Sequence, residues 1–366
     1  MELTVDRKAL LNLLIVGGAM SGKSRVMPIL DYSKFKVVKN KLILSSFDEE
    51  VAVTKRIDLV SSDGEVEFCA NTNDLVKFIK TLKDETVTIT TTDKQMSIKH
   101  SKGHGEYPIL PATEFPMVSI DPENDKFNMD SRTLWNWLNI SRGFVSSDPL
   151  RPQMCGMYMY FSGNSCGVCA TDAHRMFTDD IKLNEEYKDT TFVIAIKAFS
   201  VIMNLLEESE NVTIIIDNKN ITFKNENSKV SVRLLEGRFP NYRAIIPSEH
   251  NISISADKKD LLDSVNRIKI CSSTGTSMVV LQASGMTLDL SAQDTSLSIK
   301  GSENCFLSNH EGEDIKIGVN GEFFAHCLST IESDEIVVEL TNPNRPFVIK
   351  DSENPSRVIL LCPMAL

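Results

Sequence analysis

The run from Gly17 to Ser24, GGAMSGKS, has the G-x-x-x-x-G-K-[ST] spacing of a phosphate-binding loop. In such a loop, backbone amides surround the phosphates, the Lys contacts the β- and γ-phosphates, and the Ser binds Mg²⁺. The loop must follow a strand and open a helix, because the helix N-terminus forms part of the anion site. Here the preceding residues have a helical period, and Pro28 prevents a following helix from continuing. We therefore expect no phosphate site, and a P-loop NTPase using Gly17–Ser24 remains the alternative function.

A second candidate for phosphate chemistry is Asp217, which ends the apolar run VTIIID. Its carboxylate could bind the Mg²⁺ ion of such a loop. However, Thr90 and Leu340 close expected strands at the equivalent points of the chain. The position of Asp217 therefore has a structural explanation without a metal.

Cys166, Cys169 and His174 have part of a zinc-binding spacing, and Cys155 lies nearby in the sequence. In a strand, Cys166 and Cys169 would point to opposite faces, because side chains alternate. They could not bind one ion together, so we expect small buried cysteines and no metal or cofactor. Asp172 and His174 could suggest acid–base chemistry, but no nucleophile with a base accompanies them, and we expect Asp172 to bond local backbone amides in a turn. No catalytic residue is expected, and the chain is not predicted to be an enzyme.

The composition narrows the class of protein. The chain has 366 residues, 39 Lys and Arg against 50 Asp and Glu, a net charge of −11 and 42% apolar residues. This length predicts two or three domains with substantial cores. The eight cysteines have no regular spacing and the opening MELTVDRK is no secretion leader, so we expect a cytoplasmic protein. Apolar stretches such as Leu13–Val16 are far shorter than the ~18 residues of a membrane span.

Three segments share a pattern in which an acidic N-cap candidate precedes a helical period. They start at Asp6, Asp130 and Asp257, which are 124 and 127 residues apart. In each segment apolar residues recur at i, i+3 and i+4, which predicts an amphipathic helix. The chain therefore contains an internal repeat that opens with this helix.

A second set of three segments pairs a helical run with a strand rich in β-branched residues. Alignment of Asp74, Ala198 and Glu322 gives spacings of 124 and 124 residues. The two sets together predict an α+β fold of three repeated domains, with helices packed on one side of antiparallel sheets. Clusters of Pro, Asp, Glu and Asn place the domains at 1–121, 122–248 and 249–366. Such repeats make equivalent head-to-tail contacts, which either continue as a filament or close into a ring.

The expected helices are more basic than the rest of the chain. Over residues 6–20, 72–83, 130–144, 196–206, 257–270 and 321–331 they carry 12 basic and 7 acidic residues, a sum of +5. Because the whole chain carries −11, the remainder carries −16. The acidic balance argues against nucleic-acid binding over the whole surface, whereas the helices could form a local basic face.

Four short motifs in order, MPIL, ATDAHRM, EGRFPNYRAIIP and the terminal CPMAL, make the chain resemble the bacterial sliding clamps, the family of the DNA polymerase III beta subunit. The resemblance covers the entire chain. It implies a head-to-tail homodimer whose helices line a central hole. Double-stranded DNA passes through this hole and is enclosed without sequence preference. It further implies that the replicative polymerase, the clamp loader and repair proteins bind the ring through a short linear peptide. A linear repeat scaffold remains a rival, and no membrane partner is expected.

Basic residues of the helices and of the first loop are the expected DNA-facing side chains. By position they are Lys23, Arg25, Lys77, Lys80, Arg132, Arg142, Lys197, Arg267 and Lys269. The resemblance supports Lys80 and the loop around Lys23 in particular, because clamps of this family have basic residues at or near these points.

The resemblance also implies an apolar cleft for the partner peptide between the second and third domains. Carried over by matching motif, its residues are Met154, Thr171, His174, Arg175, Met176, Pro240, Ile245, Pro346, Leu360, Leu361, Pro363, Met364 and Leu366. Adaptable Met side chains suit a cleft that accepts several peptides. Ala173, Met176, Cys362 and Ala365 depart from the residues usual in the family, which changes the expected peptide preference but not the expected fold.

Overall fold

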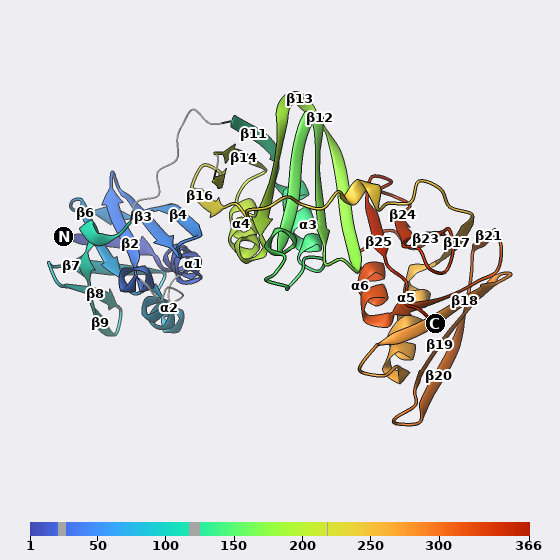
Figure 1. Ribbon diagram of the computed structural model, residues 1–366. Coiled ribbons are helices and arrows are strands. Elements are labelled where there is room, and N and C mark those ends of the chain that lie inside the picture. The colour runs from blue at the N-terminus through green and yellow to red at the C-terminus, as the bar shows by residue number, and fades with distance from the viewer. Residues whose placement is uncertain (21–26, 117–124, 218) are drawn as a thin grey trace. The chain divides into compact units, whose positions relative to one another are not determined.

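The computed structural model describes residues 1–20, 27–116, 125–217 and 219–366 (Figure 1). Its helices match the six expected segments, with ends that differ by a few residues. They are α1 (Arg7–Gly18), α2 (Thr72–Thr81), α3 (Ser131–Ser141), α4 (Phe199–Leu206), α5 (Lys258–Ile268) and α6 (Gly321–Ser329). Helix α3 ends three residues before the expected end at 144, and α4 starts three residues after the expected start because residues Ile196–Ala198 form a separate 3₁₀ turn, η4.

The strands fill the intervals between these helices in each repeat. The first repeat has β1 (Glu2–Asp6), β2 (Ser33–Val38), β3 (Lys41–Phe47), β4 (Val51–Asp58), β5 (Ser61–Ser62), β6 (Val66–Ala70), β7 (Thr86–Thr91), β8 (Gln95–His100), β9 (Gly103–Pro108) and β10 (Leu110–Pro111). The middle repeat has β11 (Asp125–Asp130), β12 (Gly156–Thr171), β13 (Arg175–Ala195), β14 (Asn211–Ile216), β15 (Asn220–Lys224) and β16 (Ser228–Arg233). The last repeat has β17 (Ile252–Asp257), β18 (Met278–Ser284), β19 (Thr287–Asp294), β20 (Ile299–Phe306), β21 (Asn309–Glu311), β22 (Ile315–Asn320), β23 (Glu335–Leu340), β24 (Phe347–Asp351) and β25 (Val358–Leu361).

The chain divides into two compact units. One contains residues 1–136 and 197–234, and the other contains residues 137–196 and 235–366. The division passes through the middle repeat, so the spatial units differ from the sequence repeats.

The first helix of every repeat begins as its sequence predicts, at an aspartate cap. The backbone N–H of Ala9 donates to the Asp6 carboxylate at 2.8 Å, and α3 and α5 repeat this bond. The Asp130 carboxylate accepts from the N–H of Thr133, and Asp257 caps α5 in the same way. Each carboxylate satisfies an N–H group that the helix itself leaves unpaired.

Strand pairing confirms the threefold repeat. The strand before the first helix pairs antiparallel with the strand after the second helix in every repeat: β1 with β7, β11 with β14, and β17 with β23. The next two pairings are also shared, since β7–β8–β9, β14–β15–β16 and β23–β24–β25 follow one another in their sheets. One supersecondary pattern thus occurs three times in the chain.

The sheets continue from one repeat into the next. Strand β16 of the middle repeat pairs with β4 of the first repeat, and β25 of the last repeat pairs with β13 of the middle repeat. In the first repeat, β9 is the strand equivalent to β16 and β25. In the last repeat, β20 is the strand equivalent to β4 and β13. Both β9 and β20 lie at the end of their sheets. The same kind of junction therefore forms twice within the chain.

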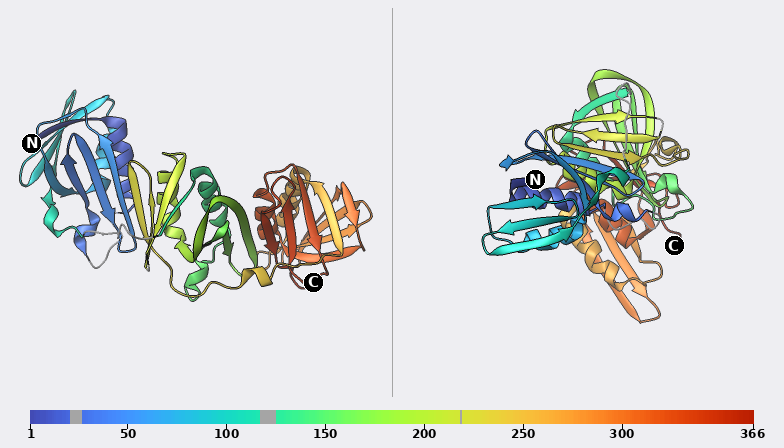
Figure 2. Two further views of the ribbon diagram at one scale, coloured as in Figure 1. Left: turned by 90° about the horizontal axis from the view of Figure 1, so that it is seen from above. Right: turned by 90° about the vertical axis from the view of Figure 1, so that its left-hand side faces the viewer.

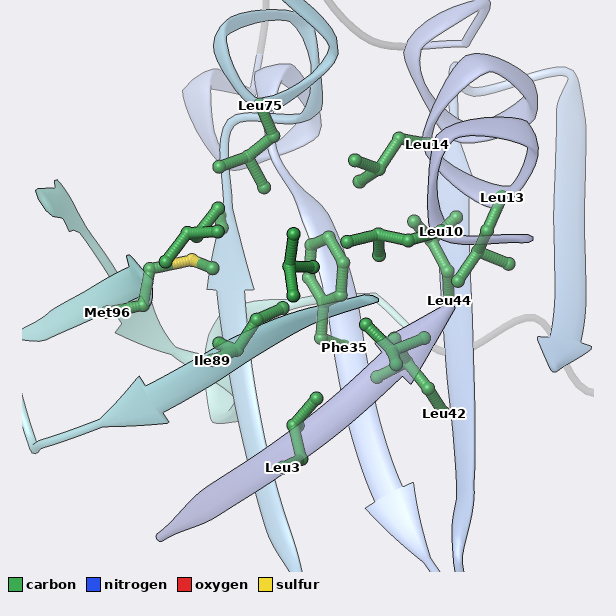
Figure 3. Packing of buried hydrophobic residues seen from close by; sticks show 14 of the residues in the cluster. Leu3, Leu10, Leu13, Leu14, Phe35, Leu42, Leu44, Leu75, Ile89 and Met96 are labelled. Atoms are coloured by element: carbon green, nitrogen blue, oxygen red, sulfur yellow. The ribbon is translucent and has the colours of Figure 1, made fainter. Parts of the chain in front are cut away.

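Apolar stripes of the helices pack on the sheets, as the sequence predicts. In the first repeat, Leu10, Leu13 and Leu14 of α1 and Leu75 of α2 converge on strand residues such as Phe35 (Figure 3). All of these side chains are at most 2% exposed. Figure 2 shows from two further sides that the helices of the last repeat, in yellow to red, likewise lie against its strands. The expected α+β fold with helices on antiparallel sheets is confirmed.

Candidate peptide surface and DNA-facing residues

The segment with P-loop spacing does not have the structure that such a loop needs. Gly17 and Gly18 are the last residues of α1, so a helix precedes the motif where a strand is required. Residues 21–26, with Lys23 and Arg25, lie outside the described residues. After them, Pro28 opens a short 3₁₀ helix, η1 (Pro28–Asp31). Asp217 is engaged in a turn, since its Oδ1 accepts the N–H groups of Lys219 and Asn220, each at 2.7 Å.

The cysteines of the expected zinc-like spacing are buried core residues. Cys166 and Cys169 both lie in β12 and have no exposed surface. Burial raises the pKa of both thiols above the ordinary value, which disfavours the thiolate that a metal would bind. Among the residues that the structure describes, no group of three or more His, Cys, Asp or Glu could hold a metal ion.

A tight turn joins β12 to β13 and positions the first residues of the candidate peptide surface. This name denotes the thirteen residues expected to bind the partner peptide. Asp172 forms the turn, because its Oδ1 accepts the N–H groups of His174 and Arg175, each at 2.9 Å. The turn role predicted for Asp172 is thereby confirmed. Ala173 has a left-handed backbone with φ of 76°, a conformation that favours glycine.

Pairing of β13 with β25 brings two distant parts of the candidate peptide surface together. Arg175 lies opposite Leu361, and Met176 lies opposite Leu360. On the other side of β25, Phe347 also pairs with Leu361, which places the preceding Pro346 at the same end of the strand. Because this register joins residues nearly 200 positions apart, the surface depends on the sheet that crosses from the middle to the last repeat.

The C-terminal tail continues the surface onto β22. The N–H of Cys362 donates to the carbonyl of His174 at 2.8 Å, and the N–H of Met364 donates to the carbonyl of Gly318 at 2.8 Å. A side chain at Gly318 would lie about 3.0 Å from Cδ2 of Leu366, so the tail packs closely on β22. Leu366 is nevertheless 64% exposed, which leaves its side chain available to a partner.

Arg175 is held in place by one carboxylate and two aromatic rings. Its Nε donates to Oδ2 of Asp172 at 2.9 Å, and its guanidinium lies 4.3 Å from the ring centre of Phe323 and 5.5 Å from that of Phe144. The ring of His174 also faces Phe323, with centroids 6.0 Å apart. These contacts fix the guanidinium by a salt bridge and by cation–π attraction.

Phe323 is a surface residue that the sequence analysis missed. It lies in α6, whose other aromatic residue, Phe324, is 1% exposed and belongs to the core. The sequence contained one signal for it: adjacent Phe residues on a helix cannot both face the same core. With Phe324 in the core, Phe323 therefore had to meet another part of the molecule.

The expected surface residues divide into a buried base and an accessible rim. Met154, Thr171, Met176, Leu360 and Leu361 are all at most 8% exposed. The remaining eight are partly or largely exposed: His174, Arg175, Pro240, Ile245, Pro346, Pro363, Met364 and Leu366. Beneath the rim, a buried cluster joins Met176 and Leu360 to Phe239 and Tyr242 of the segment that connects the middle and last repeats.

Two ionisable side chains beside this surface are kept neutral by burial. Burial lowers the pKa of His326 in α6, and the positive charge of Arg175 lowers it further, while Asp172 opposes the shift. The imidazole of His326 lies 5.0 Å from the ring centre of Phe144, and its buried Nδ1 has no hydrogen-bond partner among the described residues. Burial also raises the pKa of the Cys362 thiol. The surface is therefore apolar apart from Arg175 and the polar atoms of its turn.

The expected DNA-facing residues differ in how strongly they are already paired. Lys77 contacts Asp74 at 3.0 Å and remains 78% exposed at its side chain, and Lys80 is exposed in the last turn of α2. Arg132 and Arg142 are exposed at the two ends of α3. Lys197, Arg267 and Lys269 also form ion pairs, with Glu50, Glu303 and Glu322 respectively. A carboxylate partner neutralises part of the charge that such a side chain could offer to a phosphate.

Three profiles of one protein family match the chain in order. They are described as DNA polymerase III beta subunit, N-terminal domain, over residues 1–119, central domain, over 131–241, and C-terminal domain, over 243–365. The chain belongs to the DNA polymerase III beta subunit family. The resemblance stated on the sequence motifs is therefore confirmed.

Relatives of the chain carry the name Beta sliding clamp. The protein from Staphylococcus epidermidis is 24% identical over 376 residues, covering 100% of this chain and 99% of the relative. The protein from Rickettsia felis is 25% identical over 382 residues, with the same coverage. The chain thus spans nearly the full length of these beta subunit relatives.

Solved structures of this family share the fold. A sliding clamp from Pseudomonas aeruginosa, bound to griselimycin, has a TM-score of 0.95 and 21% identity over 100% of both chains. The DNA polymerase sliding clamp from Bacillus subtilis has a TM-score of 0.93 and 22% identity, covering 100% of this chain and 99% of the other.

Membership of the beta subunit family argues against the enzyme that the sequence left open as the alternative function. The family is one of processivity factors and not of enzymes, and neither the family nor the helix before the glycine-rich segment supports a P-loop NTPase. In the part of the chain that the structure describes, no helix is long and apolar enough to cross a membrane.

Proposed function

We propose that two copies of the chain join head to tail into a ring that encloses duplex DNA and slides along it. The ring tethers the replicative polymerase, and by the same means the clamp loader and repair proteins, through a short peptide bound at the candidate peptide surface. Retention on DNA is then topological and consumes no nucleotide. We also propose a cytoplasmic location and domains at residues 1–121, 122–248 and 249–366.

The observation that best supports a closed dimer is the pair of strands β9 and β20, which end their sheets. Strands equivalent to them already pair twice within the chain, as β16 with β4 and β25 with β13. An end strand presents a row of backbone donors and acceptors that another chain can pair with. We therefore propose that β9 of one copy pairs with β20 of the other, which repeats an existing junction twice more and closes the ring.

Exposed apolar side chains at these ends support the same contact. Phe306, the last residue of β20, is 85% exposed, and Ile270, in the adjacent η6 (Lys269–Cys271), is 76% exposed. At the other end, Tyr107 of β9 packs edge-on against Phe78 of α2, and both are partly exposed. Each end thus offers apolar surface beside a pairing strand, and its burial would stabilise the junction.

The size of the hole can be estimated from the helices. Two chains contribute twelve of the helices described here, and neighbouring axes ~10 Å apart give a circle about 120 Å around and about 38 Å across. Subtracting a helix radius of about 5 Å on each side leaves about 28 Å. A duplex about 20 Å wide fits in this space with a layer of water.

A ring of this kind need not grip DNA. Close contacts between many lysines and phosphates would hold the duplex and slow its movement. The helices carry a modest positive charge, and Lys197, Arg267 and Lys269 are already paired with carboxylates. We propose that Lys23, Arg25, Lys77, Lys80, Arg132, Arg142, Lys197, Arg267 and Lys269 face the duplex. Among them, Lys77, Lys197, Arg267 and Lys269 share their charge with a carboxylate that already contacts them.

Loading on circular DNA tests the proposal directly. The protein is loaded by a clamp loader onto nicked circular DNA, separated from free protein, and the DNA is then cut once. Release on cutting, without a change of salt, supports enclosure. Protein that stays bound to linear DNA with open ends would instead indicate ordinary binding and overturn the proposal.

A second experiment tests the peptide surface. Deletion of Leu366 together with Met364→Ala should weaken polymerase recruitment and leave the dimer intact, because both side chains lie on the tail beside β22. Recruitment is measured with surface-bound polymerase, and dimerisation by light scattering. Loss of the dimer in this variant would assign the tail to assembly and not to peptide binding.

A further inference from the structure

We propose that Arg357 is a positioning residue, which fixes β25 against β13 and thereby keeps the candidate peptide surface in its binding geometry. The inference rests on the proposed function, because it concerns how the peptide surface is held. Arg357 immediately precedes β25, the strand that carries Leu360 and Leu361. Its partners lie on both sides of the junction between the middle and last repeats.

The Arg357 guanidinium is buried among carboxylates. The residue is 5% exposed, and its Nη1 lies 2.9 Å from Oε1 of Glu332 and 3.6 Å from Oδ2 of Asp351, both in the last repeat. Its Nε lies 3.6 Å from Oδ2 of Asp179, which belongs to β13 of the middle repeat. Asp179 and Asp351 are 3% and 2% exposed. One guanidinium thus lies between two buried carboxylates that come from different repeats.

Asp179 is bonded from three directions. Its Oδ2 accepts the indole N–H of Trp137 at 3.1 Å, and its Oδ1 accepts the Ser356 hydroxyl at 2.8 Å. The backbone N–H of Asp180 also donates to Oδ1, at 2.9 Å. Trp137 lies in α3 and is 1% exposed. The network therefore connects a helix of the middle repeat to the residues that begin β25.

The buried carboxylates of Asp179 and Asp351 explain why this network fixes the junction. A buried carboxylate needs hydrogen bonds or an opposite charge, because desolvation strongly disfavours an isolated ion. Asp351 meets this need through the N–H groups of Glu332 and Glu353. Asp179 obtains its opposite charge from Arg357 across the junction. Separating the two repeats here would leave the Asp179 carboxylate without an opposite charge, while Arg357 would keep Glu332 and Asp351. The network therefore favours one register and one spacing.

The register that the network favours is the one that forms the peptide surface. Pairing of the two strands runs from Thr178 opposite Val358 to Arg175 opposite Leu361. Asp179 and Arg357 are the next residues at one end of this pairing, while the surface residues lie at its other end. A shift of β25 relative to β13 would therefore displace Leu360 and Leu361 relative to Met176.

The proposal is tested by comparing a single variant of Arg357 with a double variant of Arg357 and Asp179. Arg357→Gln should weaken binding of a fluorescent peptide carrying the polymerase's clamp-binding segment by about tenfold, a change typical of a broken network. The double variant Asp179→Asn with Arg357→Gln removes the carboxylate left unpaired across the junction, so it should bind more tightly than Arg357→Gln alone. As a matched control, Lys350→Gln breaks the partly exposed ion pair with Glu339 in the same sheet and should leave affinity unchanged.

The fluorescence of Trp137 provides a second measurement, which a purely structural role of Arg357 would leave unchanged. Trp135→Phe leaves Trp137 as the sole tryptophan of the chain. Titration with a tryptophan-free peptide should then shift the Trp137 emission with the same midpoint as peptide binding measured by anisotropy. Arg357→Gln in this background should abolish the shift even at saturating peptide, because the link between the surface and Asp179 is cut.

The outcomes separate this inference from the proposed function. Every variant is first checked for cooperative unfolding and for the mass of the wild-type assembly, and a variant that fails is replaced by Arg357→Lys. If the wild-type chain binds no peptide, the proposed function fails. If it binds peptide, and folded Arg357 variants bind equally well with an unchanged Trp137 signal, the inference is overturned.

Discussion

Gly318 accepts a hydrogen bond from the backbone N–H of Met364 at 2.8 Å, and this contact attaches the C-terminal tail to β22. No side chain separates the two backbones here. A Cβ atom on Gly318 would lie 3.0 Å from the carbonyl oxygen of Met364 and 3.0 Å from Cδ2 of Leu366. The position of the tail therefore depends on the absence of a side chain at this point.

Replacing this glycine should displace the tail. Gly318→Val adds a branched side chain where one Cβ is already crowded, so we expect peptide affinity to fall by about tenfold or more, or roughly 1.4 kcal/mol. Fluorescence anisotropy with a labelled peptide measures the change. Gly275→Ala is the matched control, because a Cβ there meets no atom within 4 Å. Equal affinities for the two variants would show that the tail does not contribute to the surface.

Ala173 should be a point of backbone strain in the turn between β12 and β13. It has φ of 76°, and two hydrogen bonds to Asp172 hold the turn in place. A left-handed alanine costs ~1–2 kcal/mol, part of which is offset by the greater freedom of glycine in the unfolded chain. We expect Ala173→Gly to stabilise the protein by about 0.5–1 kcal/mol, measured by urea denaturation. Gly237→Ala, at φ of 109°, should instead lower the free energy of unfolding. A lower free energy of unfolding for Ala173→Gly than for the wild type would contradict this account.

The proposed dimer contact predicts a strong effect at Phe306. Phe306→Glu places a charge on an 85% exposed ring beside the pairing strand, so it should shift the dimer toward monomer at micromolar concentration. Mass photometry or light scattering reports the masses. Leu150→Glu changes an equally exposed residue, 88%, that lies outside β20 and should leave the dimer unchanged. A dimer that survives Phe306→Glu would place the interface elsewhere.

Burial of His326 predicts how stability depends on pH. Because burial lowers its pKa, the unfolded chain binds more protons than the folded chain between that lowered value and the usual pKa of about 6.5. Stability contributed by the neutral imidazole is therefore present above pH of about 6.5 and is lost as the pH falls below it.

Urea midpoints at pH 7.5 and pH 5.5 measure this dependence. His326→Leu should reduce the difference between the two midpoints, although the variant also loses its ring contact with Phe144. His104→Gln changes an exposed side chain and serves as the control. If the pH dependence of His326→Leu equals that of the wild type, His326 is not the group responsible.

Much of the fold could be predicted because it depends on local patterns. The caps at Asp6, Asp130 and Asp257 and the apolar periods that follow them are visible in short windows of sequence, and their spacing revealed the repeat. Helix ends were less accurate. At Ile196–Ala198 the chain forms a 3₁₀ turn before α4, a detail set by local hydrogen bonding and not by the hydrophobic period.

The candidate site depended more on long-range contacts. The pairing of Arg175 with Leu361 joins residues far apart in the sequence, and only the resemblance to a known family indicated that they meet. Phe323 was counted as part of a repeated helix, so its contact with Arg175 was missed. Arg357 follows the polar run DSENPS, and nothing in that local sequence indicates its burial, which depends on carboxylates contributed by two repeats.

The proposed pairing of β9 with β20 would also limit how many neighbours each chain can have. Under that proposal one chain joins at most one neighbour at each of these strands, and growth stops when the ring closes. A chain altered at one of these strands would keep the other and would cap open oligomers, acting as a dominant inhibitor of assembly. Conversely, two copies fused in tandem by a linker would need no second molecule to close, and their ring would withstand dilution.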